Sequence, residues 1–493
     1  MIILIESPHK EKLLRKALQY NNIDAIIISS FGRLFDLPSA ILGVNDSLGI
    51  ESFEPVNARH FERIQAKLSS HDDLYVATDP DDEGDLIAWT VSRYRGDLAT
   101  YRLRFFDLTP SSLKQALESF QPVSSQEPAA LARRIFDRLL GYSGNDGMFL
   151  SRTAGTVLQL AATQSIPVTK FVRSHAGSSK DIQFNTTYLN ANNVSISIED
   201  NLCDGALPRY AHCLELGAEL SATPQEVFKA LQELYADGQI SYFRTSSGDV
   251  NGSATVSMDT VESDTGIENF SVKTQGRIAQ PHAGIYVTSG SSITEASPNR
   301  SPLAQILLKH LLNATLCAMA GPGGFETVKR SNDGVIWSGR LYSLRGQTFS
   351  YPQTTHALGD DVMTGAPREW STEKSYPIGK ESAIALSLVR CGIGHPSSWA
   401  GLSHNYACLL DRNGHLSSRG AAFYRKHQSE AALLLEPEVA RQIESTLLNP
   451  NEPTADKVYK SLKLCGLTPE GMGLSLSPTS SREADFSTSA PSP

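Results

Sequence analysis

Asp79-Pro-Asp-Asp-Glu-Gly-Asp85 is the stretch from which the fold can be inferred, together with the residues before it. It follows Asp73-Leu-Tyr-Val-Ala-Thr78, a short apolar run typical of a buried strand, and it precedes an expected helix. Met1-Ile-Ile-Leu-Ile5 is a similar run and ends at Glu6. Because strands and helices alternate here, the pattern predicts a parallel α/β sheet. Ligands bind such sheets beyond the carboxyl ends of the strands, so Glu6 and Asp79 are expected near one site.

The carboxylates of this region have the chemistry of a metal site. Oxygen ligands are those that Mg²⁺ prefers beside a phosphate. The predicted ligands are Glu6, Asp79, Asp81 and Glu83. An alternative interpretation of the acidic run is a helix N-terminus, where the helix dipole favours Asp and Glu.

Glu6 after the first strand and Asp79-x-Asp81 after a later one resemble the Toprim domain. That domain is shared by topoisomerases, DnaG-type primases, OLD-type nucleases and recombination proteins. The resemblance implies a metal-dependent enzyme that acts on nucleic acid, but by itself it leaves the reaction open.

A second segment distinguishes among these families. Leu234-Tyr-Ala-Asp-Gly-Gln-Ile-Ser-Tyr-Phe-Arg-Thr-Ser246 resembles the L-Y-E-x-G-x-I-T-Y-x-R-T-D-S active-site segment of type IA DNA topoisomerases. Tyr242 falls on the nucleophile and Arg244 on its partner arginine. A tyrosine hydroxyl with a pKa of about 10 is a weak nucleophile at neutral pH, and a guanidinium favours the phenolate and binds a phosphate oxygen. The alternative is an ordinary strand whose Tyr and Phe pack in a core.

Further matches follow in the order of the family. Residues 31–38 resemble G-H-I-R-D-L-P, residues 104–109 resemble R-V-x-F-x-E-I-T, and residues 132–142 resemble A-R-R-x-x-D-R-x-x-G-Y. Residues 280–285 resemble Q-x-A-H-E-A-I-R-P-T, and residues 392–400 resemble G-I-G-R-P-S-T-Y-A. The resemblance implies DNA contacts from Arg133, Arg134, Asp137, Arg138, His282, Ser397 and Ser398. The alternatives are a solvated helix face for the arginines, a helix-to-helix turn for the serines and a surface-loop position for the histidine.

Some positions depart from the family pattern. The D-P-D-R-E-G-E motif has Asp82 in place of Arg and Asp85 in place of the last Glu, and the R-T-D-S tail has Ser246 in place of Asp. Losing a cation and gaining an anion beside the metal site is expected to alter metal affinity or DNA positioning. The residues that the resemblance assigns to cleavage and resealing are all present, which predicts a divergent enzyme.

Net charge, cysteine spacing and the length of apolar runs limit these interpretations. The net charge of −9 argues mildly against nucleic acid, although an acidic chain can still line one channel with Arg and Lys. No two of the six cysteines form a C-x-x-C pair, so no zinc ribbon is expected and reduced thiols are. The only apolar run near the start is too short for a signal peptide or a membrane span, which predicts a cytoplasmic protein, nucleoid-associated if bacterial. No Walker A motif is evident, so no nucleotide cofactor is expected.

The resemblance implies a multidomain α/β, α and β fold, with a Toprim domain in a toroid around DNA. Its expected parts are a Toprim domain at 1–111, a helical base at 112–160 and 373–465, a β-rich arch at 161–211 and 301–372, a tyrosine domain at 212–300 and a disordered Ser/Pro-rich tail at 466–493. Tyr242 would become linked to a 5′ phosphate, Lys10 would donate a proton to the leaving 3′ oxygen and Mg²⁺ would assist resealing, relaxing or decatenating DNA. Two alternatives stay open: another Toprim enzyme, such as a nuclease or primase, and a catalytically silenced DNA-binding relative.

Overall fold

The computed structural model describes residues 1–142, 150–176, 183–191, 194–196, 207–250, 283–288, 300–319, 326–332, 335–344, 347–350, 355–356, 369–370, 374–468 and 485–486. The chain divides into two compact units. The first comprises residues 1–159, 391–393 and 418–493, and the second comprises residues 160–390 and 394–417. Both units are therefore discontinuous in sequence.

The first unit is built on a twisted sheet of order β2-β1-β5-β6-β7. Its parallel strands are β1 (Ile2–Ile5), β2 (Ile26–Ser29), β5 (Leu74–Val76) and β6 (Thr100–Arg102), and β7 (Gln121–Pro122) is antiparallel to β6. All four residues of β1 are buried, as expected for a central strand of a parallel sheet. The predicted parallel α/β sheet is confirmed.

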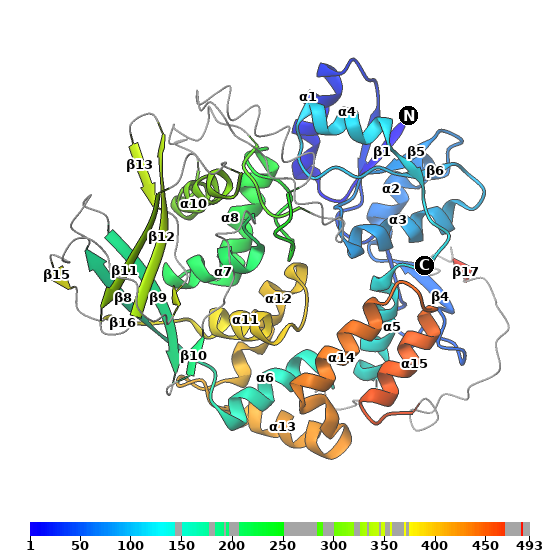
Figure 1. Cartoon of the computed structure of the whole chain (residues 1–493). Helices are drawn as coiled ribbons and strands as arrows, with labels where there is room; N and C mark the ends of the chain where they lie inside the picture. The colour runs from blue at the N-terminus through cyan, green and yellow to red at the C-terminus, as the bar shows by residue number, and fades with distance from the viewer. Residues whose placement is uncertain are drawn as a thin grey trace. The chain divides into compact units, whose positions relative to one another are not determined.

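Helices flank this sheet (Figure 1). They are α1 (Glu11–Tyr20), α2 (Ala58–Leu68), α3 (Asp82–Arg95) and α4 (Pro110–Glu118), with the 3₁₀ turn η1 (Pro8–Lys10) before α1. Each begins where its sequence allows: the side chain of Asn57 caps α2, and that of Thr109 caps α4. In α1 the buried residues Leu14, Ala17 and Leu18 recur at helical spacing, so one face packs inward.

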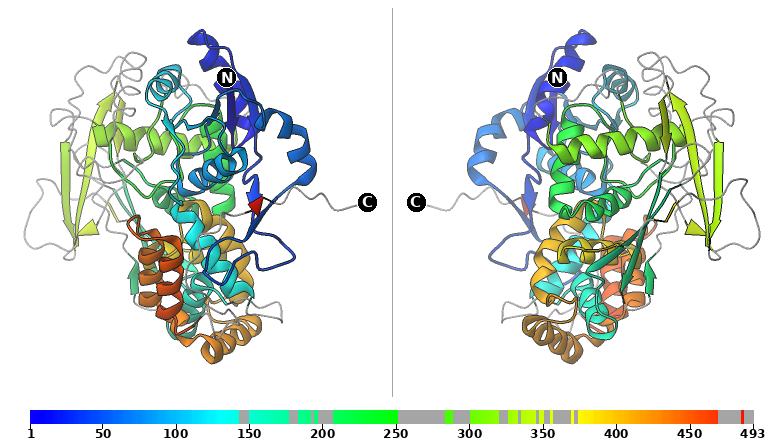
Figure 2. Two further views of the ribbon diagram at one scale, coloured as in Figure 1. Left: turned by 90° about the vertical axis from the view of Figure 1, so that its right-hand side faces the viewer. Right: turned by 90° about the vertical axis from the view of Figure 1, so that its left-hand side faces the viewer.

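A second group of helices completes the first unit. It consists of α5 (Ala129–Tyr142), the start of α6 (Arg152–Thr163), α13 (Ser418–Glu430), η4 (Ala432–Leu435), α14 (Pro437–Leu448) and α15 (Thr454–Leu464). Both α14 and α15 pack against α5, so segments about 300 residues apart in sequence share one core (Figures 1 and 2).

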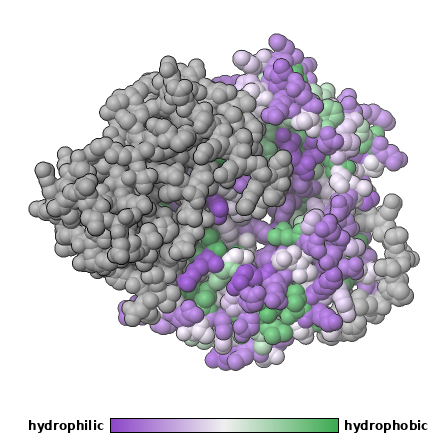
Figure 3. Space-filling view, viewed as in Figure 1, coloured by the Kyte–Doolittle hydropathy of each residue, from purple (hydrophilic) through white to green (hydrophobic). Residues whose placement is uncertain are grey.

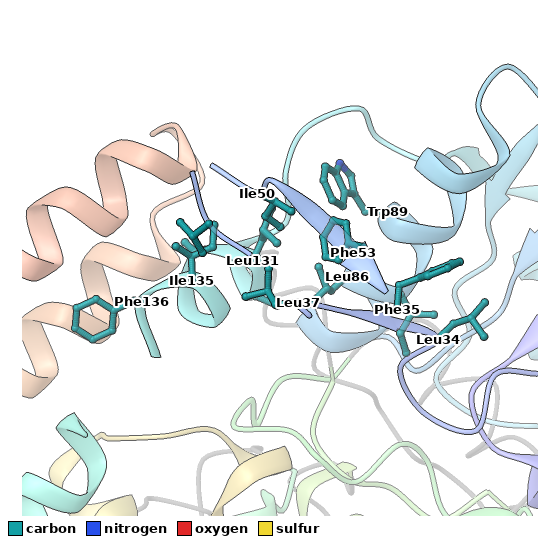
Figure 4. Close-up of a cluster of buried hydrophobic side chains, with 14 of the residues drawn as sticks. Leu34, Phe35, Leu37, Ile50, Phe53, Leu86, Trp89, Leu131, Ile135 and Phe136 are labelled. Atoms are coloured by element: carbon teal, nitrogen blue, oxygen red, sulfur yellow. The ribbon is translucent and has the colours of Figure 1, made fainter. Parts of the chain in front are cut away.

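That core is continuous from the sheet to the helices, as Figure 4 shows for residues from β3 (Phe35–Asp36), β4 (Ser52–Pro55), α3 and α5. Trp89 packs edge-on against Phe53 with ring centroids 6.1 Å apart. Ile135 and Phe136 of α5 are fully buried in the same cluster. Within the predicted tail, β17 (Asp485–Phe486) pairs in parallel with β4.

The second unit contains the helices α7 (Tyr210–Glu219), α8 (Pro224–Ala236), α10 (Pro302–Met319), α11 (Lys380–Cys391) and α12 (Pro396–Tyr406), and the turn η3 (Ala407–Leu409). Helix α8 begins with a reciprocal cap: Thr223 Oγ1 accepts from the Glu226 N–H at 3.2 Å, and Glu226 Oε2 accepts from the Thr223 N–H at 2.7 Å. Pro224 occupies the first turn, where the absence of its N–H costs no helical hydrogen bond.

The second unit also contains two sheets of antiparallel strands (Figure 2). One sheet has the order β10-β9-β8-β15, with β16 also on β8, and the other has the order β11-β12-β13, with β14 on β12. Their bounds are β8 (Thr169–Ala176), β9 (Gln183–Ala191), β10 (Val194–Ile196), β11 (Glu326–Asn332), β12 (Val335–Leu344), β13 (Gln347–Ser350), β14 (Thr355–His356), β15 (Glu369–Trp370) and β16 (Lys374–Pro377). All of these strands except β16 fall in the two segments expected to be β-rich, 161–211 and 301–372, and β16 lies in the segment 373–465 that was expected to be helical.

On the face coloured in Figure 3, hydrophilic side chains predominate and hydrophobic ones are scattered. Within the part of the chain that the structure describes, no helix is both long and apolar enough to cross a membrane. Cys213, Cys391, Cys408 and Cys465 are free thiols.

Candidate active site

Glu6 and Asp79 lie at the same edge of the parallel sheet. Glu6 follows β1 and Asp79 follows β5, and these strands are neighbours with Leu4 opposite Val76. The Ala77 N–H donates to the Leu4 carbonyl at 2.7 Å, which continues the pairing to the last residues before the site. The two carboxylates thus meet where strand order and direction predicted.

Lys10 and Asp79 form a buried ion pair. Both residues are 2% exposed, and the Lys10 ammonium donates to Asp79 Oδ1. A buried charge is tolerated when it is paired, whereas removing one partner leaves the other uncompensated. The pair therefore fixes Lys10 beside Asp79 at the candidate site.

Asp81 caps α3 with a side-chain oxygen that accepts from the Gly84 N–H at 2.8 Å. The first turn of α3 also carries Asp82, Glu83 and Asp85, where the helix dipole favours negative charge. The acidic run is therefore a helix N-terminus as well as part of the candidate site. Gly84 is required by a close approach, because a Cβ there would lie 1.9 Å from the Asp79 carbonyl oxygen.

Glu83 is electrostatically coupled to the other carboxylates. Burial raises the pKa of Glu83, Arg33 and Arg133 oppose that rise, and the charges of Asp81 and Glu6 add to it. A bound cation would relieve this repulsion. Acidic and basic side chains of the site thus both act on Glu83.

The donor set fits a divalent cation in chemistry. Buried Glu6 Oε2 has no hydrogen-bond partner within the described ranges, and it is a hard oxygen of the type that Mg²⁺ binds. In this conformation, however, Asp79 is held by Lys10, and no group of three or more acidic, His or Cys side chains among the described residues is placed to hold a metal ion. Coordination by all four predicted ligands therefore requires a side-chain rearrangement.

The two acidic departures from the family pattern both have arginine partners. Arg133 Nη2 donates to Asp82 Oδ2 at 2.9 Å. Arg102 Nε donates to Asp85 Oδ1 at 2.8 Å, and Arg104 Nη2 binds both oxygens of Asp85 at 2.9 and 3.0 Å. The added negative charge is thus offset locally.

Arg102 is a site residue that the motif reading missed. Its buried guanidinium donates to the carbonyls of Val76, Thr78 and Asp79 at 3.1, 2.9 and 2.6 Å, which fixes the backbone between β5 and α3. The spacing in the sequence indicates this residue. When the eight-residue pattern R-V-x-F-x-E-I-T is aligned so that its final threonine falls on Thr109, its first residue, the arginine, falls on Arg102 rather than on Arg104.

The predicted DNA-binding residues of α5 are engaged within the first unit. Arg134 forms a two-pronged ion pair with Asp36, and Arg138 donates to the carbonyls of Pro38 and Leu37 at 2.6 and 3.2 Å. Asp137 pairs with Arg152 of α6. These contacts brace α5 against the loop that the sequence singled out separately. DNA contact by these residues stays a prediction.

Tyr242 and Arg244 lie in an irregular segment of the second unit. The segment is held by an antiparallel bridge of Ile240 with Val287 and by the Ser241 N–H, which donates to the Tyr286 carbonyl at 2.8 Å. Tyr242 is 2% exposed. The side chains of Tyr242 and Arg244 are in contact, because Cζ of Arg244 lies 5.4 Å from the centroid of the Tyr242 ring, within cation–π range.

Aromatic rings surround this pair. Cζ of Arg244 is also 5.8 Å from the Phe228 ring, and Tyr210 stacks on Trp399 with centroids 6.1 Å apart. Burial raises the pKa of Tyr210, and the positive charge of Arg244 opposes that shift, so the two groups are near each other. Arg244 is thereby confined between apolar faces, where a positive charge attracts an anion strongly.

Three predicted DNA-binding residues remain: Ser397, Ser398 and His282. Ser398 Oγ accepts from the His395 N–H at 3.0 Å at the start of α12, as expected for a helix-to-helix turn. Ser397 is exposed beside it. His282 lies outside the described residues.

Comparisons with known proteins agree with the motifs. Residues 1–108 match the Toprim domain family. DNA topoisomerase 1 of Thermotoga maritima is 33% identical over 148 residues, 29% of this chain and 22% of the relative. DNA topoisomerase 1 of Xylella fastidiosa is 31% identical over 152 residues, 29% of this chain and 18% of the relative. The matched region spans about a fifth of the length of these relatives.

The structural likeness extends over the whole chain. The structure of full-length topoisomerase I from Thermotoga maritima superposes with a TM-score of 0.62 and 17% sequence identity, covering 94% of this chain and 90% of that one. The Toprim domain and the fold class predicted from the sequence are therefore confirmed, as is the predicted resemblance to type IA topoisomerases.

Proposed function

We propose that this chain is a type IA DNA topoisomerase, which cuts one strand through a tyrosine, passes DNA through the gap and reseals it without a nucleotide cofactor. The observation that carries the proposal is the contact of Tyr242 with Arg244, in a chain whose first unit holds the Lys10–Asp79 pair at a Toprim sheet edge. The relatives described above from Thermotoga maritima and Xylella fastidiosa are both DNA topoisomerase 1. The expected location is the cytoplasm.

In the cleavage step, Tyr242 Oη attacks a backbone phosphorus, and the bond from phosphorus to the 3′ oxygen breaks. The Tyr242 hydroxyl proton passes to water, and the leaving 3′ oxygen gains a proton from Lys10. Arg244 stabilises the charge on the phosphate oxygens. Resealing reverses these events, and the phosphotyrosine retains the bond energy. Glu6 is the alternative proton carrier.

Tyr242 belongs to the second unit and Lys10 to the first. Glu6, Asp79, Asp81 and Glu83 are the proposed holders of Mg²⁺, which would supply positive charge beside the phosphate and the 3′ hydroxyl. The strand would contact Arg133, Arg134, Arg138 and the start of α12. The proposal includes the division into a Toprim domain, a helical base, a β-rich arch and a tyrosine domain.

A cleavage-trapping assay tests the proposal. End-labelled single-stranded DNA is incubated with the protein, denatured in detergent and separated on a gel, and relaxation of supercoiled plasmid is measured with and without Mg²⁺. We expect a 5′-linked adduct that is lost in Tyr242→Phe and retained in Tyr459→Phe, an exposed tyrosine of α15. Relaxation should require Mg²⁺.

Two outcomes would contradict it. DNA binding without an adduct would indicate a catalytically silenced relative, and strand cleavage that leaves no protein on the DNA would indicate another Toprim enzyme. Tyr242→Phe and Tyr459→Phe are each made in the full chain, so that each variant differs from the parent protein by one hydroxyl group.

A further inference from the structure

Asp82 lies where a buried cation of the first unit meets an exposed surface. Its carboxylate is 44% exposed and accepts from Arg133 Nη2 at 2.9 Å, whereas the Arg133 side chain is 9% exposed. Asp82 is on α3 and Arg133 on α5, so the pair joins the Toprim sheet region to the helices below it.

Arg133 is only half satisfied by this contact. Its Nη1 is buried and has no hydrogen-bond partner within the described ranges. A guanidinium binds carboxylates and phosphates through two parallel donors, so one occupied arm leaves room for a second oxygen. Leaving a buried donor unpaired is unfavourable, which suggests that a ligand completes it.

We propose that Arg133 binds a DNA phosphate, and that the Asp82 carboxylate occupies part of this site in the unbound protein. The inference rests on the proposed function and deepens it. A strand phosphate would compete with Asp82 for Arg133, so Asp82 weakens the grip of the enzyme on DNA. Asp82, which stands where the family pattern has Arg, thereby favours release of the DNA strand.

The test is the affinity for a dye-labelled single-stranded oligonucleotide, measured by fluorescence anisotropy in EDTA so that binding is separated from metal-dependent steps. Asp82→Asn should bind about 3- to 10-fold tighter, because one anion is removed beside the phosphate. The slope of log affinity against log salt should steepen by about 0.7, as for one added phosphate contact on a single strand.

Asp456→Asn is the matched control, since Asp456 is an exposed acid in the first turn of another helix, α15. We expect little change in its affinity. In an Arg133→Ala background the gain from Asp82→Asn should shrink, and thermal unfolding of each variant checks that it folds.

Unchanged or weaker binding by Asp82→Asn would overturn the inference, as would an equal gain from Asp456→Asn or in the Arg133→Ala background. Failure of the proposed function looks different: the parent protein would form no Tyr242 adduct, whatever the affinity of the variants.

Discussion

The Gly84→Ala variant tests whether close packing at the site outweighs the general preference of helices for alanine over glycine. Alanine is favoured over glycine in a helix interior by ~1 kcal/mol, so propensity alone predicts a more stable protein. The structure predicts the opposite. The new Cβ would lie 1.9 Å from the Asp79 carbonyl oxygen, and real contacts of this kind do not fall below 3.0 Å, so backbone must move by about 1.1 Å.

The atom in the way is backbone held by Arg102, not the end of a flexible side chain. Overpacking of this kind costs about 1–3 kcal/mol, and we expect the upper end, for a net destabilisation of about 2 kcal/mol. The shift would also separate Asp79 from Asp81 and Glu83. Because misplacement by about 1 Å can lower rates about 100-fold, DNA relaxation should fall by at least tenfold.

Urea unfolding and plasmid relaxation measure these effects, with Gly401→Ala as the control. Gly401 lies within α12, and a Cβ there meets nothing within 4 Å, so that variant should be equally or more stable and fully active. If Gly84→Ala behaves like Gly401→Ala, the reasoning about close approach is refuted.

Three more predictions concern the buried polar groups. Arg134→Ala should destabilise the first unit by ~1–2 kcal/mol, and a double-mutant cycle with Asp36→Ala should reveal coupling; purely additive effects would mean that the ion pair contributes nothing. Tyr210→Phe should raise stability by ~1 kcal/mol in urea unfolding, because the buried hydroxyl has no hydrogen-bond partner within the described ranges; a loss of stability would point to an undetected partner. Burial lowers the pKa of His427 below 6.5, so the unfolded chain takes up a proton first and stability should fall as the pH drops below about 6.5. The urea midpoint at pH 7.5 and 5.5 measures this, and His427→Gln should show a smaller drop.

Local patterns in the sequence were sufficient for the sheet and for the tyrosine segment. An apolar run followed by an acidic residue marks a strand end wherever it occurs, and Tyr242 and Arg244 are two positions apart. Their contact needs no knowledge of the rest of the chain. The same holds for Pro224 at the start of α8.

Partners distant in sequence could not be predicted in this way. Arg134 and Asp36 are 98 residues apart, and each belongs to a motif that the sequence presents as independent. The arginines were expected on DNA because their segment resembles a family motif, and the alternative was a solvated helix face. Only the packing of α5 against the 33–41 loop shows that an internal acid and internal carbonyls take these donors. Charge compensation at Asp82 and Asp85 was hidden for the same reason.

The discontinuity of the first unit has a consequence for synthesis on the ribosome. Helix α5 emerges early, but α14 and α15, which cover it, follow only after the whole second unit. At a translation rate of roughly 5–20 residues per second, this interval lasts on the order of tens of seconds. During it the apolar face around Ile135 and Phe136 lacks its final partners. The nascent chain should therefore depend on chaperone protection, and a pause or premature stop before α14 would leave an aggregation-prone intermediate.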